Sequence, residues 1–73
     1  MTLHDAIYQV LNARGNPMTV RDIAHEIALR ELYEKYDGTP APPKQVDVRV
    51  DNYPELFRKA GRRVALKSWR LHI

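Results

Sequence analysis

The sequence has no cysteine, only three isolated glycines and no run of more than three consecutive apolar residues. The lack of cysteine excludes disulfides and thiolate metal sites. The lack of a long apolar run excludes a membrane-spanning helix and the core of a signal peptide within these residues. Isolated glycines do not form a glycine-rich phosphate loop. The 73 residues are 44% apolar and 29% charged. This composition is typical of a globular protein and, at this length, predicts a single small domain over 1–73.

Catalytic groups are scarce as well. The histidines, His4, His25 and His72, are scattered, and no HExxH pattern or cysteine pair accompanies them. Ser68 is the single serine, and no residue near it is placed to act as its base. We therefore expect a segment with no catalytic activity, no metal, no cofactor and no small-molecule substrate. A nuclease domain elsewhere in a longer parent chain is compatible with this expectation.

Positive charge is concentrated in the second half of the chain. Residues 1–38 carry four basic and six acidic side chains, a net charge of −2, whereas residues 39–73 carry eight basic and three acidic ones, a net +5. From Arg58 to the end there are six basic residues and no acidic one. A one-sided basic field favours a polyanionic partner, because neutralising phosphates releases counterions. A solvated basic tail is the alternative.

Two helices are predicted in the first half. Each begins with a Thr-x-x-Asp pattern, at Thr2 and again at Thr19, which is a variant of the capping box. Apolar residues then recur at helical spacing, at Leu3, Ala6, Ile7, Val10 and Leu11 in the first helix and at Val20, Ile23, Ala24 and Ile27 in the second. Residues 15–17, Gly-Asn-Pro, end the first helix. Three further apolar residues either prolong the second helix or form its exit: Leu29, Leu32 and Tyr33.

The segment 44–52 fits two structures. Val46, Val48 and Val50 alternate, which is typical of a strand, whereas Val46, Val50 and Tyr53 follow the i, i+4, i+7 spacing of a helix preceded by prolines. The local pattern does not decide between them. We favour a third helix because two short β-prone runs follow it.

Those two runs, 56–58 and 63–66, are joined by residues 59–62, which include Gly61 and predict a hairpin. Trp69 is expected to pack back onto the helices. The resulting order of three helices and a hairpin predicts a mainly α fold with a small β-hairpin. This is a winged helix-turn-helix, three helices plus a two- or three-stranded wing.

Short stretches spread over almost the whole chain resemble one family. They include Thr-Leu-His-Asp-Ala at 2–6, Pro-Met-Thr at 17–19, Gly-Thr-Pro at 38–40 and Gly-Arg at 61–62 before Val-Ala-Leu. This pattern is similar to the HARE-HTH winged-helix family, which occurs in Asx-like chromatin proteins, in domains fused to restriction endonucleases, and in the delta subunit of bacterial RNA polymerase. The resemblance implies DNA binding and, for the restriction-linked members, a link to DNA modification. The acidic tail of the polymerase subunit is not found within residues 1–73.

A helix over 44–52 predicts which side chains reach DNA bases. With Val46, Val50 and Tyr53 inward, the candidates for base reading are Lys44, Gln45, Val48 and Asn52 on the outward face and Arg49 at its boundary. Glutamine and asparagine suit adenine edges, and arginine suits guanine. Asp47 and Asp51 also face outward, either solvated, paired with Arg49, or accepting from cytosine N4.

Val48 is the apolar member of this outward face. It could contact the methyl group of thymine, and by the same geometry that of 5-methylcytosine. The alternatives are that an exposed valine has no function or that Val48 packs against the wing.

The predicted backbone contacts lie on the wing and at the start of the second helix. Arg58, Lys59, Arg62 and Arg63 are expected to cluster around Gly61 without any counter-charge, and Lys67 and Arg70 extend the basic strip. Thr19 and Arg21 are placed to hold a phosphate at a helix N-terminus, although capping alone also explains Thr19.

These features predict a non-catalytic domain that binds double-stranded DNA. We expect it to be the N-terminal module of a longer protein, targeting a restriction or modification-sensing activity to DNA that is in some cases methylated. The alternative is a protein-interaction module of a transcription or chromatin complex. The expected partners are duplex DNA and other domains of the same parent protein, with no membrane. The expected location is the bacterial cytoplasm, at the nucleoid, or the nucleus if the source is eukaryotic.

Overall fold

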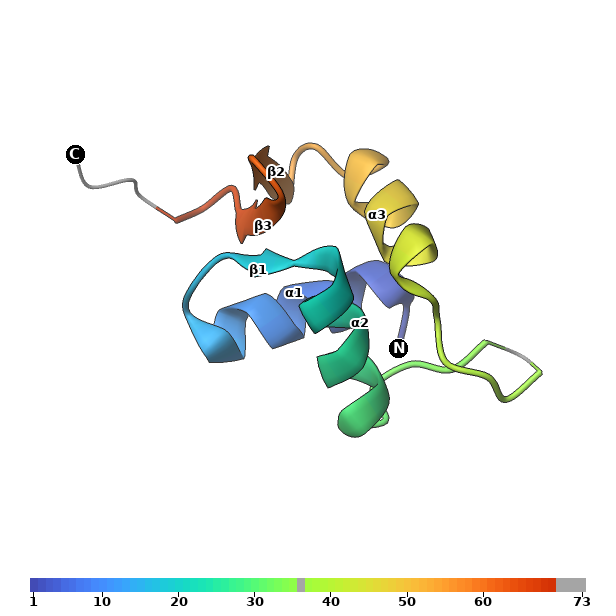
Figure 1. Cartoon of the computed structure of the whole chain (residues 1–73). Coiled ribbons are helices and arrows are strands. Elements are labelled where there is room, and N and C mark those ends of the chain that lie inside the picture. The colour runs from blue at the N-terminus through green and yellow to red at the C-terminus, as the bar shows by residue number, and fades with distance from the viewer. Residues whose placement is uncertain (36, 70–73) are drawn as a thin grey trace.

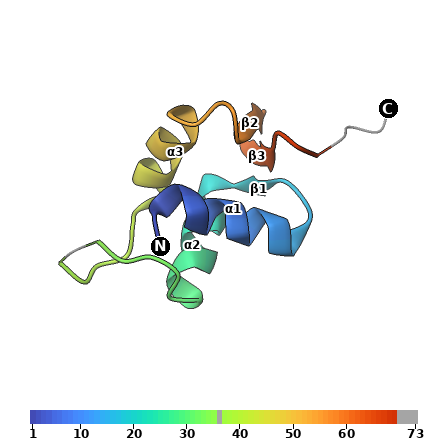
Figure 2. The same cartoon turned by 180° about the vertical axis from the view of Figure 1, so that it is seen from behind.

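The computed structural model describes residues 1–35 and 37–69, which form three helices and a three-stranded sheet (Figures 1 and 2). Along the chain these are α1 (Leu3–Arg14), β1 (Met18–Thr19), α2 (Val20–Leu29), α3 (Pro43–Asp51), β2 (Phe57–Ala60) and β3 (Arg63–Leu66). The predicted winged-helix arrangement is therefore confirmed. Among the predicted site residues, Arg70 lies outside the described part of the chain.

Both predicted helix starts are confirmed by their caps. The Thr2 hydroxyl accepts a hydrogen bond from the Asp5 backbone N–H at 3.2 Å, and the Thr19 hydroxyl accepts one from the Asp22 N–H at 3.1 Å. Each bond satisfies one of the amide groups that a helix leaves unpaired in its first turn. α1 ends at Gly15, where a φ of 77° places the backbone in the left-handed region that glycine adopts without steric cost.

The end of α2 resolves an alternative that the sequence left open. The helix ends at Leu29. Leu32 and Tyr33 lie in the segment that leaves the helix, where their partly buried side chains pack against the core. Glu31 has a φ of 53°, a left-handed conformation that ends regular helix geometry. The Leu32 N–H donates to the Ile27 carbonyl at 3.1 Å, which satisfies one of the last carbonyls of the helix.

Residues 43–51 are helical, so burial selects the helical interpretation of this segment over the strand. Val46 and Val50 are buried in the core, while Val48, on the opposite face, is 50% exposed. Pro42 is the N-cap and Pro43 the first helical residue, a position where the missing N–H of proline costs no helix hydrogen bond. The helix therefore buries one valine face and leaves the other face free.

The sheet has strand order β1-β3-β2, and both pairings are antiparallel. The predicted four-residue connection 59–62 is wrong: Lys59 and Ala60 pair with Val64 and Arg63, so the turn itself has only two residues, Gly61 and Arg62. Gly61 has a φ of 65°, as the first position of a type II′ turn requires. Because Lys59 and Ala60 are paired with β3, they belong to β2, and the loop is shorter than predicted by these two residues.

One apolar core joins all these elements. Its largest fully buried side chains come from α1, α2, α3 and β3: Leu3, Ile7, Val10, Leu11, Ile23, Ile27, Val46, Val64 and Leu66. Trp69 is half-buried and packs against this core, as predicted. The sheet lies over α1, and α3 packs beside α2 (Figure 1). No helix in the described ranges has the length and apolar character needed to cross a membrane.

Candidate nucleic-acid interface

The five predicted base-reading residues all lie on α3 or at its end. Lys44, Val48 and Asn52 are exposed, whereas Gln45 and Arg49 are half-buried. Asn52 is the C-cap, and its backbone N–H bonds to carbonyls of the last turn, which leaves its side chain at the end of the exposed face. The structure therefore places this set on a single helix with Val48 near its middle.

The two carboxylates of α3 have a partner on the wing. The Lys59 ammonium contacts the Asp47 carboxylate and lies 3.0 Å from Oδ1 of Asp51. The prediction that the wing cations have no counter-charge is thus wrong for Lys59, because folding brings β2 beside α3. The suggested pairing of these carboxylates with Arg49 is also wrong: over residues 1–35 and 37–69, no ion pair involves Arg49.

This ion pair changes the titration of the lysine. Hydrogen bonds to Asp47, and then to Asp51, raise the pKa of Lys59 above its ordinary value. The folded state therefore gains stability from the charged lysine below its unfolded pKa, near 10.4, and loses it only as the pH rises through the raised folded value. At neutral pH the ammonium is fully charged.

The basic residues of the wing do not form one cluster. Side chains alternate between the two faces along a strand, so Phe57 and Lys59 share the face that packs toward α3 and the core. Arg58 lies opposite Ala65 in the sheet and belongs to the other face. The pleat of β2 thus directs Arg58 and Lys59 to opposite faces of the sheet, although both residues border one hollow near the end of α3.

A hollow of about 420 Å³ lies between the start of α2, α3 and the wing turn. We call it the turn hollow; it is lined by Thr19, Val20, Arg21, Asp47, Lys59, Gly61, Arg62 and Val64. The first turn of α2 directs backbone N–H groups outward, and the Thr19 hydroxyl binds that of Asp22. The structure thus brings together four predicted backbone-contact residues, from α2 and from the wing.

A second hollow of about 390 Å³ contains an arginine that the sequence did not single out. Arg14, at the end of α1, lines it together with Arg63 of β3, along with Asn16, Pro17, Met18 and Asp22. Arg14 lies in the half of the chain with net negative charge, and no local pattern links it to the wing. Only the pairing of β1 with β3 brings the end of α1 next to Arg63.

A third hollow, of about 310 Å³, lies between the end of α3 and the sheet. Arg58, Lys59 and Lys67 line it, together with Val50, Asp51, Pro54 and Phe57. The Lys67 ammonium donates a hydrogen bond to the Pro54 carbonyl at 3.3 Å, so one of its three donors is engaged within the protein. Arg58 and Lys67 therefore lie close to the exposed end of α3.

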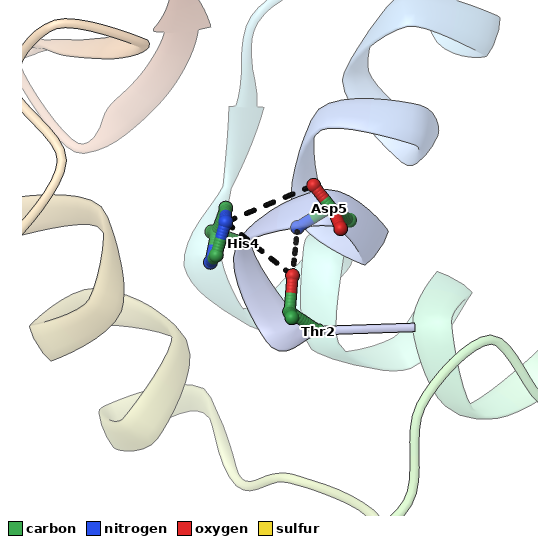
Figure 3. A network of polar contacts seen from close by, with 3 residues as sticks. All are labelled: Thr2, His4 and Asp5. Carbon is green, nitrogen blue, oxygen red and sulfur yellow. Dashed lines mark hydrogen bonds and ion pairs between the residues drawn. The ribbon is translucent and has the colours of Figure 1, made fainter.

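His4 connects the start of α1 to the residue that follows α3. Its ring stacks on Tyr53 with a centroid separation of 4.1 Å and an angle of 21° between the planes. Its Nε2 lies 3.4 Å from the Thr2 hydroxyl and 3.7 Å from the Asp5 carboxylate (Figure 3). Nδ1 is buried and has no hydrogen-bond partner among the residues that the structure describes. His4 thus has a packing role, and in the described ranges no three His, Cys, Asp or Glu side chains are grouped to hold a metal.

Comparison with known proteins agrees with this architecture. The family model HARE-HTH, whose description names an "ASXL, restriction endonuclease HTH domain", matches residues 1–69. No curated protein and no solved structure matches the chain. The match spans every helix and strand described above. The chain therefore belongs to the HARE-HTH family and is a helix-turn-helix DNA-binding domain.

Proposed function

We propose that the domain binds double-stranded DNA with α3 in the major groove and with the wing and the start of α2 on the phosphate backbone. The observation that carries this proposal is the exposed face of α3, which is bordered by two hollows lined with basic side chains. The major groove admits an α-helix, and helix-turn-helix domains read bases with such a helix. Cations on both sides of it suit the two phosphate strands that border the groove.

The base-reading roles follow from side-chain chemistry. Gln45 and Asn52 can each form paired hydrogen bonds to an adenine edge, while Arg49 and Lys44 can donate to guanine O6 and N7. Gln45 lies near the N-terminus of α3, the end that approaches the bases most closely in this class of domain. These assignments give α3 the main role in sequence preference.

Val48 adds a means of sensing DNA modification. Its side chain is 50% exposed and the residue lies near the middle of the helix face proposed to read bases. An apolar group at that point complements the methyl group of thymine or 5-methylcytosine. We infer from this exposure that the domain prefers duplexes that present a methyl group opposite Val48.

The backbone contacts fall into groups that follow the hollows. Thr19, Arg21 and Arg62 hold one phosphate at the turn hollow, where the first turn of α2 contributes backbone N–H groups. Arg63, with Arg14, contacts the phosphate strand beyond β1. Arg58 and Lys67 act at the end of α3. Arg70, which lies outside the described residues, stays a predicted backbone contact from the sequence alone. Phosphate contacts of this kind position the protein without selecting a sequence.

The biological role proposed for the domain is targeting. The family description includes a restriction endonuclease domain, and this is the basis for the proposed link to DNA modification. A non-catalytic DNA-binding module in such a protein would deliver an activity carried by another part of the parent chain to its site. Duplex DNA and those other parts are the proposed partners, at the bacterial nucleoid or in a nucleus.

A binding titration tests the proposal directly. Labelled duplex, single-stranded and cytosine-methylated duplex DNA are each titrated with the domain at about 50 and about 200 mM salt. About five phosphate contacts should make duplex affinity fall by about 10²- to 10³-fold between these salt concentrations. Duplex should bind more tightly than single strands. Absence of duplex binding at the lower salt would reject the proposal and favour the protein-interaction alternative.

A further inference from the structure

Lys59 occupies an unusual place for a wing cation. Its ammonium contacts the carboxylates of both Asp47 and Asp51, which lie one helical turn apart on α3. All three side chains remain substantially exposed, at 38%, 43% and 61% for Lys59, Asp47 and Asp51. The three groups therefore form a network on the molecular surface, beside the helix face proposed to read bases.

Two carboxylates at this position oppose DNA binding. A helix in the major groove lies between two rows of phosphates, and a carboxylate near a phosphate is repelled. Without a partner, Asp47 and Asp51 would place two negative charges beside the proposed interface. With the Lys59 ammonium between them, the network carries a net single negative charge, and that charge is spread over groups already bonded to a cation.

The geometry also limits what else Lys59 can do. An ammonium has three N–H donors, and the contacts to Asp47 and Asp51 engage two of them. To bind a phosphate through those donors, Lys59 would have to release the carboxylates and leave them unpaired next to the DNA. Arg62, in the adjacent turn, makes no such ion pair in the described part of the chain.

We propose that Lys59 is a positioning residue that screens Asp47 and Asp51 from the DNA phosphates, and that it does not itself contact the backbone. The proposal rests on the proposed function, binding of duplex DNA by α3 and the wing. In this proposal Asp47 and Asp51 hold the wing against α3 through Lys59, and they do not read bases. It replaces the backbone contact that the sequence alone suggests for Lys59.

The test is a double-mutant cycle on duplex affinity. Lys59→Met is introduced into the wild-type domain and into the Asp47→Asn/Asp51→Asn domain. Because Lys59 screens the carboxylates, its loss should weaken binding by about 10-fold in the wild type and by less than about 3-fold in the asparagine background. Lys59→Arg, which keeps the cation, should bind within about 3-fold of wild type.

The control is Arg63→Met, a cation on a different hollow from the two aspartates. It should cost the same factor in both backgrounds, because its proposed partner is a phosphate. The salt dependence adds a second readout. In the asparagine background, Lys59→Met should leave the slope of log affinity against log salt unchanged, whereas losing a phosphate contact lowers it by about 0.9.

Circular dichroism and thermal unfolding show whether each variant is folded. Exposed ion pairs contribute little to stability, so all variants should fold. An equal cost of Lys59→Met in both backgrounds, with a reduced slope, would overturn the screening role while leaving duplex binding intact. Failure of the wild type to bind duplex at about 50 mM salt would instead reject the proposed function.

Discussion

Thr19 lies directly opposite Arg63 in the antiparallel pairing of β1 with β3, and the same Thr19 is the N-cap of α2. One residue thus belongs both to the sheet and to the start of a helix. The turn end of the β2–β3 hairpin is therefore tied to the first turn of α2 by ladder hydrogen bonds. This connection holds Arg62 and Arg63 at a defined position relative to the backbone N–H groups of α2.

Replacing Thr19 with valine should destabilise the domain by about 1 kcal/mol, because the hydroxyl that accepts the Asp22 N–H is lost. Valine keeps the branched shape that suits β1, so the sheet pairing should persist. Urea denaturation followed by circular dichroism measures the change. Thr19→Ser keeps the hydroxyl and should lie close to wild type, and equal losses for serine and valine would rule out capping as the cause.

Arg62→Ala and Arg63→Ala should each weaken DNA binding for every duplex sequence and reduce the salt slope by about one unit. Both residues are exposed beside hollows proposed to receive phosphates. Fluorescence anisotropy at several salt concentrations measures affinity and slope together. Arg30→Ala is the control, since Arg30 pairs with Glu26 at 2.9 Å and should leave the slope unchanged. A loss restricted to one sequence would contradict the backbone role.

Val48→Ala should reduce the preference for methylated over plain duplex by about 2- to 5-fold, because two methyl groups of the proposed apolar contact are removed. Val48 is half exposed, so the substitution should leave the fold intact. Competition between methylated and plain probes of one sequence measures this preference. Equal losses of affinity on both probes would eliminate methyl reading.

Thr39→Val should raise the pKa of Asp37 toward its ordinary value. In the wild type the Thr39 hydroxyl donates to the Asp37 carboxylate at 2.7 Å, and this bond, with one from the Thr39 N–H, lowers that pKa. A lowered folded pKa contributes stability above the unfolded value, near 3.9, that is lost as the pH falls through the folded value. Carboxyl NMR titration measures the shift, and an unchanged Asp37 midpoint in Thr39→Val would contradict it.

His4→Phe should leave the domain as stable as wild type or more stable by up to about 1 kcal/mol. Phenylalanine retains an aromatic ring against Tyr53 and removes the buried Nδ1, which has no hydrogen-bond partner within residues 1–35 and 37–69. His4→Ala should instead lower stability by about 1 kcal/mol or more, since the stacked ring is lost. Thermal unfolding of the wild type and both variants measures these differences in stability. A phenylalanine variant less stable than the alanine variant would refute this account.

Much of the fold could be predicted from the chain alone because its signals are local. The caps at Thr2 and Thr19 and the apolar stripes of α1 and α2 involve residues within one or two helical turns of each other. The exposed position of Val48 also followed from helical periodicity once a helix was assumed. Such short-range patterns depend on backbone geometry that is the same in every helix.

Other features depended on residues that are distant in the sequence. The segment 43–51 satisfies both a helical and an extended pattern, and the burial of Val46 and Val50 in the core selected the helix. β1 is only two residues long and is a strand solely because it pairs with β3. In each case local preference was weak, so tertiary contacts determined the structure.

The same distinction applies to the candidate interface. Charge along the chain indicated a basic second half, but it did not show that Lys59 would pair with Asp47 and Asp51, or that Arg14 would lie beside Arg63. Charge balance is a property of the sequence, whereas pairing requires two side chains to lie within about 4 Å. That proximity arises only when the helices and strands pack, because packing decides which face of each element meets its neighbours.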